Sequence, residues 1–129
     1  MFSGTRPGNL GVKNGRFAPC KTSPNCVSSQ ADPADQEHHI APIVFSGTMH
    51  ELRRAVESMT RAGVIREEGN YLYAEYTSAL MGYVDDVELY YDEGAGLVHV
   101  RSASRLGRSD FGVNRKRIEE LRGLIGSRR

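Results

Sequence analysis

Two stretches in the C-terminal half decide the fold of this chain: YVDDVELYY at residues 83–91 and LVHVRSAS at residues 97–104. Both are rich in residues that favour β-strands, and the glycine-bearing segment between them is typical of a hairpin loop. If residues 92 and 97 close a four-residue loop, antiparallel pairing fixes every cross-strand neighbour. The predicted pairs on one face are Tyr91 with Val98, Leu89 with Val100, Val87 with Ser102, and Asp85 with Ser104. The predicted pairs on the other face are Tyr90 with His99, Glu88 with Arg101, and Asp86 with Ala103.

This register gives the hairpin one face that is apolar near the loop and polar at its far end. We expect Asp85 to point toward the core, where a carboxylate needs hydrogen-bond donors. Ser102, Ser104 and backbone amides near the following helix are the candidate donors. On the opposite face, Glu88 and Arg101 would form a cross-strand ion pair, worth about 0.5 kcal/mol if exposed.

Upstream of the hairpin, the sequence predicts a strand followed by a helix. Residues 40–45 are a short apolar run, and Pro42 restricts it to a sheet edge or to the start of a strand. Thr48 and Glu51 have the spacing of a helix capping box, and apolar side chains then recur at helical intervals. Gly63 is the expected end of this helix.

Two further strands are predicted at residues 64–67 and 71–77, and a second helix begins within residues 110–115. The resulting order is β-α-β-β-β-β-α. Strands joined by short loops form an antiparallel meander, and two amphipathic helices need one face on which to bury their apolar sides. We therefore predict an α+β fold, with a curved antiparallel sheet and both helices packed on one face. This order is similar to the TATA-box-binding-protein-like fold, an architectural analogy that carries no function.

The N-terminal segment, residues 1–39, is rich in Gly, Pro, Asn and Ser and has little hydrophobic periodicity. We interpret it as an extended arm packed on a single α+β domain of residues 40–129. Cys20 and Cys26 lie in this arm, and Pro24 and Asn25 favour a turn that brings them within disulfide range. A disulfide, a pair of free thiols, and a Cys2His2 zinc site completed by residues 38–39 all remain open.

Length and charge exclude some classes of protein. At 129 residues, with 39% hydrophobic and 26% charged residues, the chain fits one soluble domain, and it has no apolar run long enough to span a bilayer. No secretory signal is visible, so we expect a cytoplasmic protein, or a periplasmic or envelope protein if a leader has been removed.

Net charge is +4 over residues 1–31, −9 over residues 32–100 and +6 over residues 101–129. If the two basic terminal segments fold over the acidic middle segment, their charges largely neutralise each other. Alternatively, the basic residues form a positive surface patch that binds an anionic ligand or a membrane surface. The absence of any reader motif and the low total charge argue against nucleic acid.

The richest polar stretch is RSASRLGRSDFGVNR, residues 101–115. It forms a strand-to-helix loop, where free backbone N–H groups and arginine side chains can bind an anion. The same residues could instead have a purely structural role, in which Asp110 or Asn114 caps the helix and the arginines form ion pairs with Asp85 and Asp86. The candidate ligand-binding residues are Arg101, Ser102, Ser104, Arg105, Arg108, Asp110, Asn114, Arg115, Asp85 and Asp86. No phosphate-binding loop, nucleophile elbow or metal-binding motif is present, so we expect no metal ion and no cofactor.

Several motifs are similar to those of the uncharacterised family known as domain of unknown function 1499 (DUF1499). The matching segments are NLGV (9–12), APC (18–20), SPNCVSS (23–29), YVDDV (83–87), VRSASR (100–105) and SDFGVNR (109–115). The resemblance implies that Cys20, Cys26 and the arginine-serine loop belong to one shared design. Many members look like envelope proteins with a leader, an anchor or a plastid-lumen address. The family supplies no agreed catalytic residues.

These observations leave three functional hypotheses. The first is a non-catalytic binding or accessory domain that receives an anionic small molecule, or a protein partner, at residues 101–115. The second is a small enzyme that uses Asp85 as base or Cys26 as nucleophile. The third is a structural envelope component whose open sheet face contacts partners.

Overall fold

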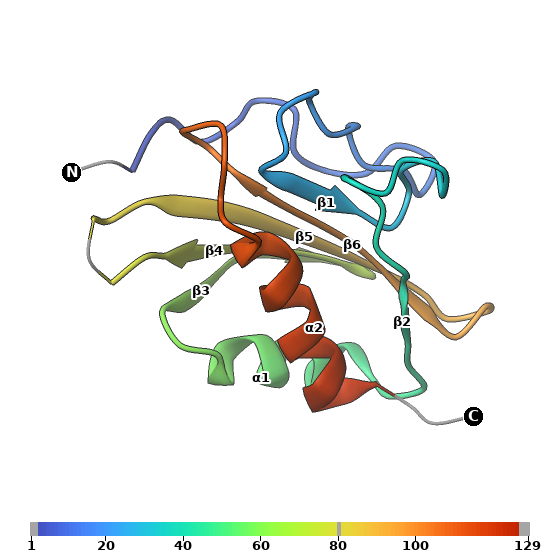
Figure 1. Ribbon diagram of the computed structural model, residues 1–129. Coiled ribbons are helices and arrows are strands. Elements are labelled where there is room, and N and C mark those ends of the chain that lie inside the picture. Colours follow the sequence, from blue (N-terminus) through green and yellow to red (C-terminus); the bar gives the residue numbers. More distant parts are fainter. Residues whose placement is uncertain (1–2, 80, 127–129) are drawn as a thin grey trace.

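The computed structural model describes residues 3–79 and 81–126, which form three layers (Figure 1). The middle layer is a six-stranded antiparallel sheet with strand order β1-β6-β5-β4-β3, and β2 pairs with the same edge of β6 as β1 does. Helices α1 and α2 cover one face, and the N-terminal arm crosses the other. The strands are β1 (Cys26–Ser28), β2 (Ile43–Val44), β3 (Ala62–Glu68), β4 (Tyr71–Thr77), β5 (Val84–Asp92) and β6 (Leu97–Ser104), and the helices are α1 (Met49–Ser58) and α2 (Val113–Ile125).

The central hairpin, β5 and β6, has the register that the sequence predicts. Asp85 lies opposite Ser104, Glu88 opposite Arg101, and the other predicted pairs are likewise present. Side chains alternate between the two faces, so Leu89 and Val100 point toward the helices and are almost completely buried. The prediction of an α+β fold with both helices on one face is confirmed.

The first helix begins as its capping box predicts. The Thr48 side chain accepts a hydrogen bond from the backbone N–H of Glu51, and the Glu51 carboxylate accepts one from the N–H of Thr48. The prediction that the helix ends at Gly63 is wrong: α1 ends at Ser58, because Met59 is extended, and Gly63 already lies in β3. Arg61 between them adopts a left-handed conformation.

One buried cluster joins the helices to the sheet. Leu52 and Val56 of α1 and Ile118 and Leu121 of α2 are at most 1% exposed and pack on the apolar face of the sheet. Full burial of four aliphatic side chains stabilises the fold by roughly 1.5–3 kcal/mol each before cavity effects are counted. The helix positions are therefore set by burial of the apolar sides that their periodicity predicts.

The arm has more regular structure than the sequence indicates. Cys26–Ser28 forms β1, which pairs with the Arg101–Ala103 part of β6 and was not predicted as a strand. Conversely, the strand predicted at 40–45 is short, because only Ile43–Val44 pairs with β6, directly after Pro42. Phe17 anchors the arm in a second, smaller apolar cluster with Tyr71 and Tyr73 on the outer face of the sheet.

Candidate functional site

The ten candidate ligand-binding residues do not converge on one place. Strand alternation divides them between two faces, because Asp85 and Asp86 are neighbours in β5 and point in opposite directions. The helix side receives Asp85, Ser102, Ser104, Asp110 and Asn114, and the arm side receives Asp86, Arg101 and Arg105. Arg108 lies exposed in the β6–α2 loop. Arg115 donates to the backbone carbonyls of residues 36 and 37 and ties α2 to the arm.

On the helix side, a closed polar network connects α2 to the end of the hairpin. Asp85 is buried as expected, but its partner is Arg117, at 2.8 Å, rather than the two serines. Arg117 also donates to the Asn114 side-chain oxygen at 2.9 Å, and its guanidinium lies 4.7 Å from the centre of the Tyr76 ring. Ser102 donates to the same Asn114 oxygen. This network holds the structure together and leaves little donor capacity for a ligand.

The N-cap residue of α2 is Gly112 rather than Asp110 or Asn114, and Asp110 lies two positions before it. The Asp110 carboxylate accepts hydrogen bonds from the backbone N–H groups of Gly112, at 2.8 Å, and Asn114, at 3.2 Å, and from the Asn114 side chain. Burial alone would raise the pKa of Asp110, but these hydrogen bonds lower it below its usual value. Two backbone amides at this helix start are therefore already occupied by the chain's own carboxylate.

On the arm side, Arg105 is the centre of a second network. Its guanidinium binds both carboxylate oxygens of Asp86, at 2.8 and 2.9 Å, and also contacts Glu75 at 2.5 Å. The Tyr73 hydroxyl donates to the same two carboxylates, and Arg6 from the arm donates to Glu75 at 2.7 Å. Burial opposes ionisation of Glu75, but the hydrogen bonds from Arg6, Tyr73 and Arg105 prevail and lower its pKa to about 2.

Glu88 and Arg101 lie side by side as predicted, but they are buried beneath the arm rather than exposed. Their closest atoms, Nη1 of Arg101 and Oε1 of Glu88, are 3.7 Å apart, too far for a good hydrogen bond. Glu88 uses its other oxygen to accept from the Gly11 N–H and the Tyr71 hydroxyl. Among the described residues, Glu88 Oε1 and Arg101 Nε have no hydrogen-bond partner.

A cavity of about 550 Å³ adjoins this buried pair. Lys21, Arg101 and Arg105 contribute three cationic side chains to its wall, and Asp86 contributes one carboxylate. The remaining lining comes from the arm, from the loop that precedes β1, and from the end of β6: Thr5, Pro7, Gly8, Asn9, Ser23, Asn25, Cys26, Ala103, Ser104 and Gly107. We call this the arm-side cavity.

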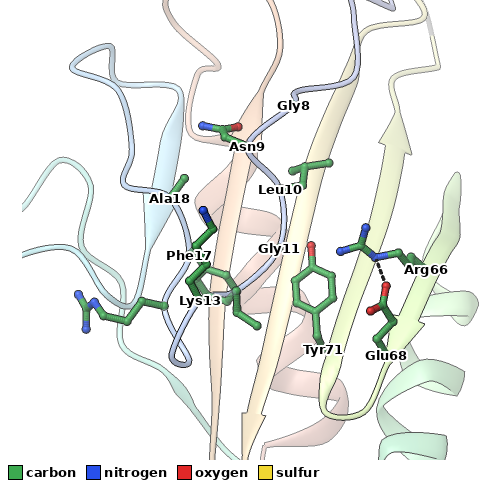
Figure 2. Close-up of a pocket in the computed structure, with 12 residues that line it drawn as sticks. Gly8, Asn9, Leu10, Gly11, Lys13, Phe17, Ala18, Arg66, Glu68 and Tyr71 are labelled. Carbon is green, nitrogen blue, oxygen red and sulfur yellow. Dashed lines mark ion pairs between the residues drawn. The ribbon is translucent and has the colours of Figure 1, made fainter.

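Figure 2 shows a second hollow farther along the arm, of about 600 Å³. The arm backbone from Gly8 to Ala18 forms one side, and Tyr71, Arg66 and Glu68 lie opposite. Arg66 turns toward Glu68 in an exposed ion pair at 2.8 Å, and it also lies 5.2 Å from the centre of the Tyr71 ring. This hollow contains no buried charge without a partner, so it is a weaker candidate than the arm-side cavity.

The loop before β1 is fixed at two points. Cys20 and Cys26 form a disulfide with a Cα–Cα distance of 5.8 Å, so neither carries a thiol or is available to a zinc ion. His38 is buried between the Ser23 carbonyl, 2.9 Å from Nε2, and the Asp35 carboxylate, 2.7 Å from Nδ1. These two acceptors raise the pKa of His38, and both contacts hold the loop in place.

Residues 3–79 and 81–126 contain neither a metal-binding cluster nor a membrane-spanning helix. No cluster of three or more His, Cys, Asp or Glu side chains is arranged to hold a metal ion there. Nor does that part of the chain contain a helix that is both long and apolar enough to cross a membrane.

Several residues of the two networks and of the arm-side cavity were not identified from sequence. Arg117 lies three residues after Asn114 on α2, so helical spacing could have placed it toward the sheet. Tyr73 and Glu75 reach the Arg105 network through β4, whose register with β5 was not predicted. Lys21 and Arg6 come from the arm, which has no periodicity to orient its side chains.

The fold and the arm-side cavity define a small α+β domain with a disulfide-bonded arm over one sheet face. The family model described as "Protein of unknown function (DUF1499)" matches residues 16–125, and the chain belongs to this family. The sequence resemblance is thereby confirmed. No curated protein and no solved structure matches the chain.

Proposed function

We propose that this chain is a non-catalytic binding domain that receives the anionic group of a small organic molecule in the arm-side cavity. The observation that carries the proposal is Arg101. Its side chain lines the cavity and is poorly paired: the nearest carboxylate is 3.7 Å away, and Nη2 donates to the Pro19 carbonyl over a long 3.4 Å. A guanidinium whose contacts are this long gains free energy when an anionic acceptor binds it at a shorter distance.

The chemistry of the wall supports an anion rather than a neutral or cationic ligand. Guanidinium groups match carboxylate and phosphate geometry, and the exposed side chain of Lys21 adds a further positive charge to the lining. Both Asp86 oxygens are occupied by Arg105, so this carboxylate repels an incoming anion less than a free one would. At about 550 Å³, the cavity has the size of ordinary small-molecule sites.

The enzyme hypothesis has less support. Cys26 is joined to Cys20 and has no thiolate, and Asp85 is ion-paired with Arg117 inside the helix-side network. A general base needs access to its substrate, and Asp85 is only 7% exposed. A binding role requires only the cavity and its cations.

The test is calorimetric titration with citrate and with inorganic phosphate, using chloride at matched ionic strength as the reference. We expect citrate to bind and Lys21→Gln to weaken its affinity about fivefold, since one rim charge near an anion contributes on the order of 1 kcal/mol. Lys13→Gln removes a charge that does not line this cavity and should leave the affinity unchanged.

Arg101→Gln should abolish citrate binding. Because this substitution leaves the buried Glu88 carboxylate without its cation, the amide NMR spectrum of the variant must first be shown to be native. Backbone amide shifts on citrate addition should cluster at Gly8 and Gly107, which line the cavity. No binding of either anion, or equal losses in the Lys13 and Lys21 variants, would refute the proposal.

A further inference from the structure

The exposed large apolar side chains are concentrated at one end of the molecule. Of seven in the described part of the chain, five lie in or beside the β4–β5 and β6–α2 loops. These five are Met81, Tyr83, Leu106, Phe111 and Val113, and we call them the apolar tip. The two loops share one end of the sheet because Asp85 pairs with Ser104 and the Arg105 N–H bonds the Val84 carbonyl (Figure 1).

Phe111 is the most exposed of the five, with 92% of its surface in solvent. Its backbone has φ +53°, a left-handed conformation that is uncommon for a non-glycine residue. The turn is held by its neighbours: the Phe111 N–H donates to the Ser109 hydroxyl, and Asp110 accepts from the Gly112 N–H. The local hydrogen bonds therefore fix a phenyl ring outward in solvent, where it gains no burial within this chain.

The charges around the apolar tip are mainly positive. Arg108 and Lys116 are exposed beside Phe111 and Val113, and Arg61 lines the same open hollow as Met81. Four acids lie nearby. Glu75 and Asp85 line the same hollows but are ion-paired with Arg105 and Arg117. Asp110 accepts hydrogen bonds from the start of α2, and Glu120 is exposed one turn beyond Lys116. The exposed charges beside the apolar groups are therefore three cations and Glu120, with Asp110 half-buried.

We propose that the apolar tip inserts into the headgroup region of a membrane that contains anionic lipids. A protruding aromatic residue with flanking cations suits this interface, because the ring enters the acyl boundary while the cations remain at the lipid phosphates. A protein partner fits less well: stable protein interfaces bury about 800 Å² per side over complementary surfaces, whereas this tip is formed by two loop ends and one projecting ring. The proposal is independent of the anion site, which lies beneath the arm.

Co-sedimentation with vesicles tests this proposal. Wild-type protein should bind vesicles of phosphatidylcholine mixed with phosphatidylglycerol, and should bind pure phosphatidylcholine vesicles far more weakly. Phe111→Asn should reduce the partition coefficient about tenfold, because one buried apolar side chain is lost while asparagine still tolerates the left-handed backbone. Leu124→Gln is the matched control, because Leu124 is 54% exposed on α2 but lies outside the tip.

A double variant, Arg108→Gln with Lys116→Gln, should lose most of the preference for anionic vesicles and most of the salt dependence of binding. Three results would each overturn the proposal. They are no binding of wild-type protein to the anionic vesicles, equal losses in the Phe111 and Leu124 variants, and a sedimentation-velocity dimer that Phe111→Asn abolishes, which would assign the tip to self-association.

Discussion

The ion pairs of Glu75 allow a quantitative prediction. One of its carboxylate oxygens, Oε2, accepts from Arg6, Tyr73 and Arg105, and the pKa of Glu75 falls from 4.5 to about 2. A shift of this size corresponds to about 3 kcal/mol of stability once the carboxylate is ionised in both the folded and the unfolded chain. Because the folded pKa is lowered, this stability is present above the unfolded pKa and is lost as pH falls through the window from 4.5 to about 2. Glu75→Gln keeps an acceptor oxygen but removes the charge, so it should lower the free energy of unfolding by that amount near neutral pH.

The assay is urea unfolding of both proteins, followed by circular dichroism at several pH values between neutrality and the acid limit of the folded state. The difference between wild type and variant should be largest near neutral pH and should shrink as pH falls through the acid window. Glu57→Gln is the control, because Glu57 forms an exposed pair with Arg53 and should contribute at most about 0.5 kcal/mol. A difference that does not change with pH, or one no larger than that of the control, would show that the Glu75 network does not depend on charge.

Three other predictions concern stability. The pKa of His38 is raised in the folded protein, so its contribution to the free energy of unfolding is complete below the unfolded pKa and is lost as pH rises through the folded pKa. In thermal unfolding scans at several pH values, a His38→Gln variant should lack this loss of stability. Replacing Cys20 and Cys26 by serine should lower the free energy of unfolding by about 2 kcal/mol, and wild type under reducing conditions should show the same decrease. Leu52→Ala should cost about 3 kcal/mol in urea unfolding, because the side chain is completely buried, whereas Leu124→Ala at an exposed position should cost less than about 0.5 kcal/mol.

The sequence was sufficient for those parts of the fold that local periodicity controls. Alternation with period two, together with a four-residue loop, leaves one sensible register for residues 83–104, and that register is correct. The capping box likewise locates the start of α1. In both cases the signal lies within a few residues, so no knowledge of distant parts of the chain is required.

The features that were missed depend on contacts between distant segments. A strand of three residues, Cys26–Ser28, has too little pattern to be recognised without its partner on β6. The predicted pair of Glu88 and Arg101 has the expected neighbours but not the expected exposure, because the arm that covers it carries no periodic signal. Of the four candidate arginines, only Arg101 and Arg105 line the arm-side cavity. The division of the candidate residues between two faces followed from the strand alternation that the sequence had already predicted.

The pairing of β1 and β2 with β6 has a consequence for how the protein is made. The edge that both strands join is supplied by residues 97–103, far downstream of β1 and β2. During synthesis, the segment from Cys26 to Val44 leaves the ribosome long before that edge exists, so it cannot join the sheet until residues 97–103 have been made. The disulfide needs no distant segment, because its cysteines are only six positions apart, and it can close while β6 is still unmade. A nascent chain interrupted before β6 would therefore carry a finished loop and an arm with no sheet edge to join.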